Sequence, residues 1–231
     1  MKGTAMKKSQ KGFTLVEIAI VLVIIGLLLG GILKGQEMIT QAKIKNVIAD
    51  MTGVSAAMYG YQDRYRALPG DDRNASTRWT APPALPAPGP NTGNGIIEGT
   101  YNSTTATDES RLFWDHLRRA GFISGAGNEQ PFNAVSGRSG VQTGDGAGGA
   151  VGVLGVANPP NTQHFNSLIL CTANLPDKIA GSIDAQMDDG NGQSGSVRAL
   201  AGAGNVAIPP AQPASAYVED GVTTFVICRQ M

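Results

Sequence analysis

The chain has 231 residues, with 18 basic and 18 acidic side chains, so its formal charge at pH 7 is zero. If the four lysines of residues 1–12 are removed, 14 basic side chains remain against the 18 acidic ones. Nucleic-acid-binding proteins usually carry a stripe of positive charge. The only basic pair in the remaining chain is Arg118–Arg119, which a helix surface explains, so the composition argues against a nucleic-acid partner.

A basic segment precedes a long apolar run at the N-terminus. Residues 1–12 contain four lysines and no acid, and almost every residue of 13–33 is apolar or small. About 20 such residues span a bilayer as a helix. Because clustered lysines stay on the cytoplasmic side, we expect the rest of the chain to lie outside the cytoplasm.

Glu17 is the only charge in the apolar run. A carboxylate within a bilayer costs a few kcal/mol on insertion scales, and such groups usually serve a function. One interpretation is that Glu17 meets a cation of a neighbouring subunit, such as a free amine created at Phe13 by cleavage. The other is that Glu17 lies at the membrane interface and is merely tolerated.

The stretch from Gly12 to Glu17 reads GFTLVE and is followed by the apolar run. It resembles the cleavage and methylation site of type IV prepilins and type II secretion pseudopilins. The resemblance covers about the first 50 residues. It implies that a prepilin peptidase/methyltransferase cuts between Gly12 and Phe13 and N-methylates Phe13. It also implies that Glu17 pairs with the amine of an adjacent subunit during assembly.

The sequence departs from this family at Lys34, where many members have a proline. Gly26, Gly30, Gly31 and Gly35 lie in the same stretch, and each mid-helix glycine costs about 0.5–1 kcal/mol relative to alanine. One hypothesis is that residues 26–35 unwind in a filament. The alternative is that these glycines permit close packing of helices.

The helix is expected to continue beyond the membrane segment, because apolar residues recur there at spacings of three and four. Leu68-Pro69 predicts its end, so the predicted helix covers residues 13–68 after a leader of residues 1–12. The members of the apolar stripe are Ile44, Val47, Met51, Val54, Met58, Tyr61 and Tyr65.

Residues 69–231 are predicted to form a globular head rich in glycine and proline. We expect a loop over 69–107, extended at 81–90, and then a short helix with Thr107 or Asp108 as its cap and Gly121 at its end. A second helix is predicted to open at Pro176. Strands are predicted at 165–171, 197–200 and 222–228, with a further candidate at 151–156. The predicted fold class is α+β, a long helix packed on a small antiparallel sheet.

The only two cysteines are Cys171 and Cys228. In an oxidising compartment they can pair and close a long loop, worth about 4 kcal/mol in the loop-entropy description. The alternative is two unpaired buried thiols. The pairing would tie the last strand to the end of an earlier one.

A metal site is a further candidate. Asp188, Asp189 and Asn191 follow Asp184 in a short acidic segment, and Ca²⁺ prefers carboxylate, amide and carbonyl oxygens. The spacing does not match an EF-hand loop, and the resemblance adds that some pseudopilins bind calcium in a loop of the head. The alternative is a helix end closed by Gly190. No other cofactor is expected.

An enzyme is not expected. His116 and His164 are the only histidines, and neither a G-x-S-x-G nor an H-E-x-x-H motif nor a P-loop occurs. The sequence favours a structural subunit of a type IV pilus-like filament, a homopolymer that also meets other pilins. The subunit would wait in the inner membrane with its head in the periplasm and then join a cell-surface filament. The alternatives are a type II secretion pseudopilin and a minor or tip pilin with an adhesive head.

Overall fold

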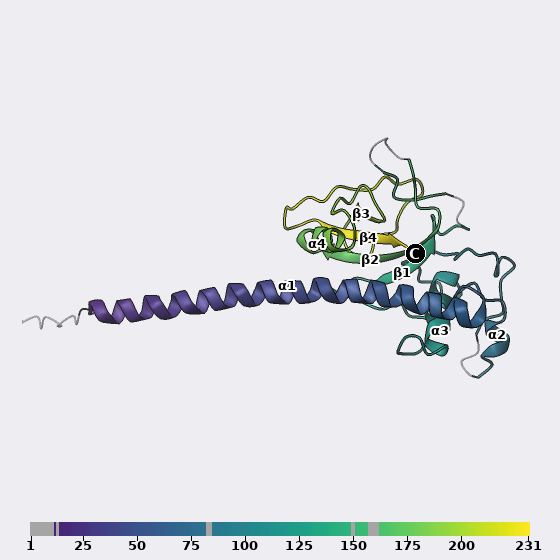
Figure 1. The fold of residues 1–231 in the computed structure, drawn as a ribbon, viewed down its shortest axis with the longest axis horizontal. Coiled ribbons are helices and arrows are strands. Elements are labelled where there is room, and N and C mark those ends of the chain that lie inside the picture. The colour runs from purple at the N-terminus through teal and green to yellow at the C-terminus, as the bar shows by residue number, and fades with distance from the viewer. Residues whose placement is uncertain (1–11, 13, 82–84, 149–150, 157–161) are drawn as a thin grey trace, which may run out of the picture. The chain divides into compact units, whose positions relative to one another are not determined.

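The computed structural model describes residues 12, 14–81, 85–148, 151–156 and 162–231 (Figure 1). The chain divides into two compact units, residues 1–42 and residues 43–231. Each unit is described by itself below. The first contains the apolar start of helix α1, and the second contains the head.

Helix α1 spans Leu15–Tyr65. Its last part carries the predicted apolar stripe, which is confirmed: the six stripe residues from Ile44 to Tyr61 are buried, Ala57 joins them, and Tyr65 is partly buried. The helix ends slightly before the predicted position. Arg66 adopts a φ of 55°, in the left-handed region, and its N–H donates to the carbonyl of Gln62 at 2.8 Å. This closes the last turn before Leu68-Pro69 is reached.

The head contains three further helices and one four-stranded sheet. The helices are α2 (Ala75–Arg78), α3 (Glu109–Arg119) and α4 (Asp177–Met187). The strands are β1 (Ser139–Thr143), β2 (Leu168–Pro176), β3 (Val197–Ala201) and β4 (Thr224–Gln230), arranged in the order β1-β2-β4-β3 with every neighbouring pair antiparallel. The predicted α+β class is therefore confirmed.

Both faces of the sheet are buried. One face forms a core with the last part of α1 and with α3 and α4, through residues such as Leu170 and Ile227. The opposite face is covered by irregular segments, through residues such as Val153, Phe165 and Val226. Successive strand residues point to opposite faces, so neighbours such as Val226 and Ile227 contribute to different cores. Figure 1 shows the sheet beside the last part of α1, with α4 against it.

Cys171 and Cys228 form a disulfide, so the alternative of two free thiols is excluded. The two residues lie opposite each other in the register of β2 and β4, with their Cα atoms 4.0 Å apart. Because β2 extends to Pro176, the bond joins the last strand to the middle of β2 and not to its end.

Several local predictions need correction. Residues 151–156 form no strand and contribute only isolated bridges, for example between Val153 and Phe165. Strand β1 was not predicted, and neither was α2 within the expected loop. Pro176 is the last residue of β2, so α4 begins one residue later, at Asp177. In the stretch 81–90, residues 82–84 lie outside the described residues, and the others form no helix or strand.

The predicted start and end of α3 are found in the structure. Asp108 precedes the helix, but its side chain makes no capping bond and accepts the Ser103 hydroxyl instead. Gly121 follows the helix with a φ of 79°, a conformation that glycine adopts without steric penalty.

Candidate functional site

The N-terminal turn of α1 contains the predicted processing and assembly residues. Gly12 is exposed, whereas Phe13, the predicted site of methylation, lies outside the described residues. Glu17 is exposed and accepts two hydrogen bonds at Oε2, from the Thr14 N–H at 2.7 Å and the Thr14 hydroxyl at 2.8 Å. The Thr14 hydroxyl oxygen in turn accepts from the Glu17 N–H at 3.3 Å.

These reciprocal bonds form a capping box, in which an N-terminal Thr and a Glu three residues later satisfy each other's backbone N–H groups. The Thr-x-x-Glu pattern is visible in the sequence, so this role of Glu17 is readable without a structure. Oε2 of Glu17 is used by the cap. Oε1 has no hydrogen bond within the described part of the chain.

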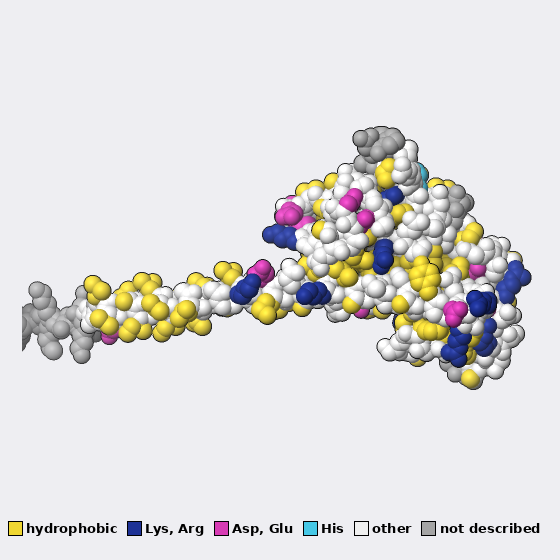
Figure 2. Space-filling view, in the orientation of Figure 1, with side chains coloured by type: hydrophobic (Ala, Val, Ile, Leu, Met, Phe, Trp, Pro, Cys, Tyr) yellow, Lys and Arg dark blue, Asp and Glu magenta, His cyan; other side chains and the backbone are white. Residues whose placement is uncertain are grey.

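The apolar side chains at the start of α1 are exposed. The large hydrophobic side chains between Leu15 and Leu33 are 46–86 % exposed, and Figure 2 shows them as a yellow segment of the helix. Among the described residues, α1 is the helix that is long and apolar enough to cross a membrane, judged by length and composition. An apolar surface of this extent marks a contact with lipid or with other proteins.

The glycines at 26–35 lie in an unbroken helix. An added Cβ at Gly26, Gly30, Gly31 or Gly35 would meet no atom within 4 Å. Packing inside this chain therefore does not require them. The two hypotheses for these glycines, unwinding in a filament or close helix packing, both remain predictions.

His116 is a structural residue at the junction of α1, α3 and the segment after α1. It is 3 % exposed, and its Nδ1 accepts the N–H of Gly70 at 2.8 Å. Its ring is stacked on Tyr61, with 6.2 Å between centroids, and lies 6.0 Å from Trp79. Burial lowers the pKa of His116 to about 4, so the ring is neutral at pH 7.

The last part of α4 and the two residues after it bring three carboxylates together. Ligand oxygens of Asp184, Asp188 and Asp189 lie within 4.8 Å of one another. Both oxygens of Asp189 accept hydrogen bonds, from the N–H of Asn191 and the hydroxyl of Ser194. The buried Oδ1 of Asp184 has no hydrogen-bond partner, although its Oδ2 accepts the Tyr217 hydroxyl at 2.8 Å.

The donor set is of the oxygen type that suits Ca²⁺. Asp188 Oδ2 accepts the N–H groups of Ser196 and Val197, which leaves its Oδ1 and the Oδ1 of Asp184 as the open oxygens. Burial and the neighbouring carboxylates raise the pKa of Asp184 to about 6. A nearby cation would favour its ionised form.

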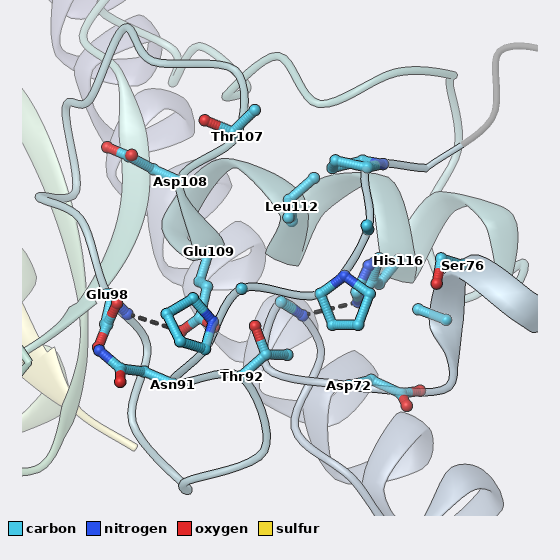
Figure 3. A pocket seen from close by; sticks show the side chains of 17 residues that line it. Asp72, Ser76, Asn91, Thr92, Glu98, Thr107, Asp108, Glu109, Leu112 and His116 are labelled. Atoms are coloured by element: carbon cyan, nitrogen blue, oxygen red, sulfur yellow. Dashed lines mark hydrogen bonds between the residues drawn. The ribbon is translucent and has the colours of Figure 1, made fainter.

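A pocket of about 280 Å³ lies beside the first turn of α3. Figure 3 shows its labelled side chains converging from α3, from the segment after α1 and from residues 91–98. The lining residues contribute carboxylates, a histidine and apolar surface, the last from prolines and Leu112. These segments are separate in the sequence, and no sequence motif predicts the pocket.

The architecture defines a class of protein. A long N-terminal helix, apolar and uncovered at its start, packs through its last part on a small antiparallel sheet, and this arrangement is consistent with the pilin-like fold. The prokaryotic N-terminal methylation motif matches residues 7–33. The chain therefore carries the N-terminal signature of type IV pilins and pseudopilins. Searches of curated proteins and of solved structures found no match.

This motif belongs to a structural group of proteins and not to a family of enzymes. It implies processing by a prepilin peptidase and assembly with other pilins. Together with the apolar helix it fits a protein that is first anchored in a membrane and then built into a filament.

Proposed function

We propose that this protein is a structural subunit of a type IV pilus-like filament. The observation that carries the proposal is the contrast along α1. Its apolar start is exposed, whereas its last part is buried in the core of the head. A helix whose apolar start is exposed can contact lipid first and sister helices later.

Processing would prepare the helix for assembly. A prepilin peptidase would cut between Gly12 and Phe13, and the new amine of Phe13 would be N-methylated. The subunit would wait in the inner membrane with its head in the periplasm. The disulfide between Cys171 and Cys228 supports this placement, since disulfides persist in oxidising compartments.

Glu17 would then act in assembly. Its Oε2 is held by Thr14, and its Oε1 is open to accept from the amine of an adjacent subunit. An ion pair formed there would offset the cost of a carboxylate in an apolar surrounding. The pair would also fix the axial register of one helix against the next.

Three Glu17 and Thr14 variants separate these roles. Glu17→Gln keeps an amide oxygen for the Thr14 cap but removes the charge, Glu17→Ala removes both, and Thr14→Ala removes the cap but keeps the charge. We expect both Glu17 variants to insert into the membrane normally and to form no filaments, while Thr14→Ala still assembles. Normal filaments from Glu17→Gln would contradict the pairing role.

Mass spectrometry of filaments sheared from the cell surface tests the function itself. We expect the dominant species to begin at methylated Phe13. A processed chain found only in the cell envelope would favour a type II secretion pseudopilin instead. A chain that still begins at Met1 would overturn the processing argument. A processed chain present in traces at filament ends would favour the minor or tip pilin.

We also propose that the carboxylates of Asp184, Asp188 and Asp189 hold a calcium ion in the head. The buried, unpartnered Oδ1 of Asp184 is the observation that favours this second role. Calcium prefers six to eight oxygens, so backbone carbonyls or waters would complete the shell.

A further inference from the structure

Arg198 is a buried cation on an edge strand of the sheet. It is the second residue of β3 and lies on the same face as Leu200, toward the irregular segments that cover the sheet. Its side chain is buried, with the residue 7 % exposed, and it forms no ion pair with any described residue. A buried charge is costly unless it is paired and hydrogen-bonded, so the groups around Arg198 decide what the site can bind.

Neutral groups hold most of the guanidinium in place. Its Nε donates to the carbonyl of Gly195 at 3.1 Å, and its Nη1 donates to the carbonyls of Leu154 at 2.8 Å and Gln163 at 2.6 Å. The guanidinium carbon lies over the ring of Phe165, 4.1 Å from its centroid. Leu154 and Gln163 have φ values of 52° and 49°, so the backbone is strained where it supplies two of these oxygens.

The remaining nitrogen of Arg198, Nη2, is open. It has no hydrogen bond among the described residues, and it is not one of the fully buried polar atoms that lack a partner. Because Arg198 lines a pocket of about 430 Å³, Nη2 is the part of the guanidinium that a ligand in this pocket can reach. Asp188 is the acid whose charge acts on Arg198, but its Oδ2 accepts the N–H groups of Ser196 and Val197 instead.

The walls of this pocket are polar and contain no carboxylate among the described residues. Val156 is the apolar side chain of the lining, and the neutral polar part consists of Gln163, Asn191, Gln193, Ser194 and Gly195. The Nδ2 of Asn191 and the side chain of Gln163 have no hydrogen bond within the described chain. Amide side chains both donate and accept, as hydroxyl groups do. One open cationic donor, several amides and little apolar surface therefore suit a ligand with a negative charge and hydroxyl groups.

We propose that this pocket binds a hydroxylated carboxylate, such as a sugar acid, with the carboxylate at Nη2 of Arg198 and the hydroxyl groups at Asn191 and Gln163. The carboxylate supplies the counter-charge that the described chain does not provide, and a charge-assisted hydrogen bond is about twice as strong as a neutral one. The same chemistry has two sources: a free sugar acid, and a uronic acid residue of an acidic polysaccharide. The proposal is independent of the role of α1 in assembly and of calcium binding.

The first experiment measures binding of D-galacturonate to the full-length protein in detergent by isothermal titration calorimetry, at pH 7 in buffer freed of divalent cations. Without such cations, no metal ion can bridge the carboxylate to Asp188. We expect saturable binding of galacturonate and binding of D-galactose that is about tenfold weaker or more. The neutral sugar keeps the ring hydroxyl groups but lacks the charge that Nη2 of Arg198 would recognise.

Gln163→Glu tests the site without changing Arg198. It adds a carboxylate that can occupy Nη2 itself, and it leaves in place the residue 163 carbonyl that accepts from Nη1. We expect it to weaken galacturonate binding about tenfold. Gln41→Glu, which adds the same charge at an exposed position of α1, should bind as the wild type does. Arg198→Lys keeps the charge but removes Nη2, and it should also weaken binding about tenfold.

Three results would overturn the proposal: no saturable binding of galacturonate or its trimer, equal binding of galactose, or unchanged binding by the two pocket variants. A second titration, with tri-galacturonate, distinguishes the two sources. Equal affinity for the monomer and the trimer supports a free sugar acid as the ligand. Binding of the trimer that is about tenfold tighter or more supports a uronic acid residue within a polysaccharide.

Discussion

The buried His116 of α3, which is stacked on Tyr61 near the end of α1, should make the head sensitive to acid. His116 is held between Tyr61 and Trp79 and accepts the Gly70 N–H at Nδ1. Protonation would place a charge in this buried site and replace the acceptor at Nδ1 by a donor. We therefore expect the head to lose stability between pH 7.5 and pH 5.

The magnitude follows from the pKa of His116. Its pKa is about 4 in the folded protein and 6.5 in an unfolded chain. Because the folded state binds fewer protons between these values, the stability that the neutral ring contributes is present above pH 6.5 and is lost as the pH falls toward 4. One pKa unit corresponds to about 1.36 kcal/mol, so the free energy of unfolding should fall by about 2 kcal/mol between pH 7.5 and pH 5.

The assay is urea unfolding of the full-length protein in detergent at both pH values, followed by tryptophan fluorescence. The only two tryptophans, Trp79 and Trp114, both lie in the head. The comparison is with His116→Asn, whose Oδ1 can still accept the Gly70 N–H but which does not titrate. We expect this variant to be less stable at pH 7.5 and to lose about 2 kcal/mol less than the wild type on acidification.

Asp184 acts in the opposite direction, because its raised pKa of about 6 makes the folded state bind more protons between pH 3.8 and 6. It is present in both proteins, so its effect cancels in the difference. Equal losses of stability in the wild type and in His116→Asn would refute the reasoning.

Three further predictions concern the head. Gly140→Ala should lower the free energy of unfolding by about 1–3 kcal/mol, because an added Cβ would lie 1.9 Å from the carbonyl oxygen of Tyr101. Gly53→Ala should raise the free energy of unfolding by about 0.5–1 kcal/mol, because Gly53 lies in a helix and nothing lies within 4 Å of the new Cβ. A Gly140→Ala variant that is more stable in urea than Gly53→Ala would contradict both predictions. Removing the disulfide by a double substitution to serine should cost about 4 kcal/mol in the same assay, and an unchanged midpoint would show that the covalent link adds nothing. Calcium at 100 times its Kd should stabilise the head by about 2.7 kcal/mol and raise its melting temperature; Asp184→Asn should abolish the shift, and no shift in the wild type would remove the calcium proposal.

The long helix was predictable because its signals are local. The apolar run and the stripe from Ile44 to Tyr61 repeat at helical spacing, and each residue needs only its neighbours in the sequence to be recognised. The strands β2, β3 and β4 were predicted for the same reason, since each is a short apolar run. The prepilin-like segment at Gly12–Glu17 is also a continuous motif.

The elements that the sequence did not reveal depend on distant partners. Strand β1 has the sequence SGVQT and little apolar character, yet most of it is buried. It pairs with β2 on one side, and at Gly140 the backbone of Tyr101 approaches so closely that a side chain would not fit. Residues 151–156 have the opposite properties: they are apolar but cover the sheet without joining it. The amino-acid composition therefore predicts neither the strand at β1 nor the irregular structure of residues 151–156.

The candidate sites differ in the same way: some depend on a continuous stretch of sequence and others on contacts between distant segments. The methylation motif is contiguous, whereas the pocket at Glu109 is built from three separate segments of the chain. The acidic segment could be recognised as a candidate cation site from the sequence. The burial of Asp184 and the lack of a hydrogen-bond partner at its Oδ1 could be seen only in the structure.

The position of the last strand determines when the head can be completed. Strand β4 lies inside the sheet, between β2 and β3, and covers Thr224–Gln230 close to the end of the chain. Neither β2 nor β3 can pair with its central partner until those residues have been synthesised. A chain interrupted before Thr224 would therefore have an open sheet and an unpaired Cys171, because β4 supplies both the central strand and Cys228. Strand β4 thus completes the sheet and the covalent bond together, in a single step of folding.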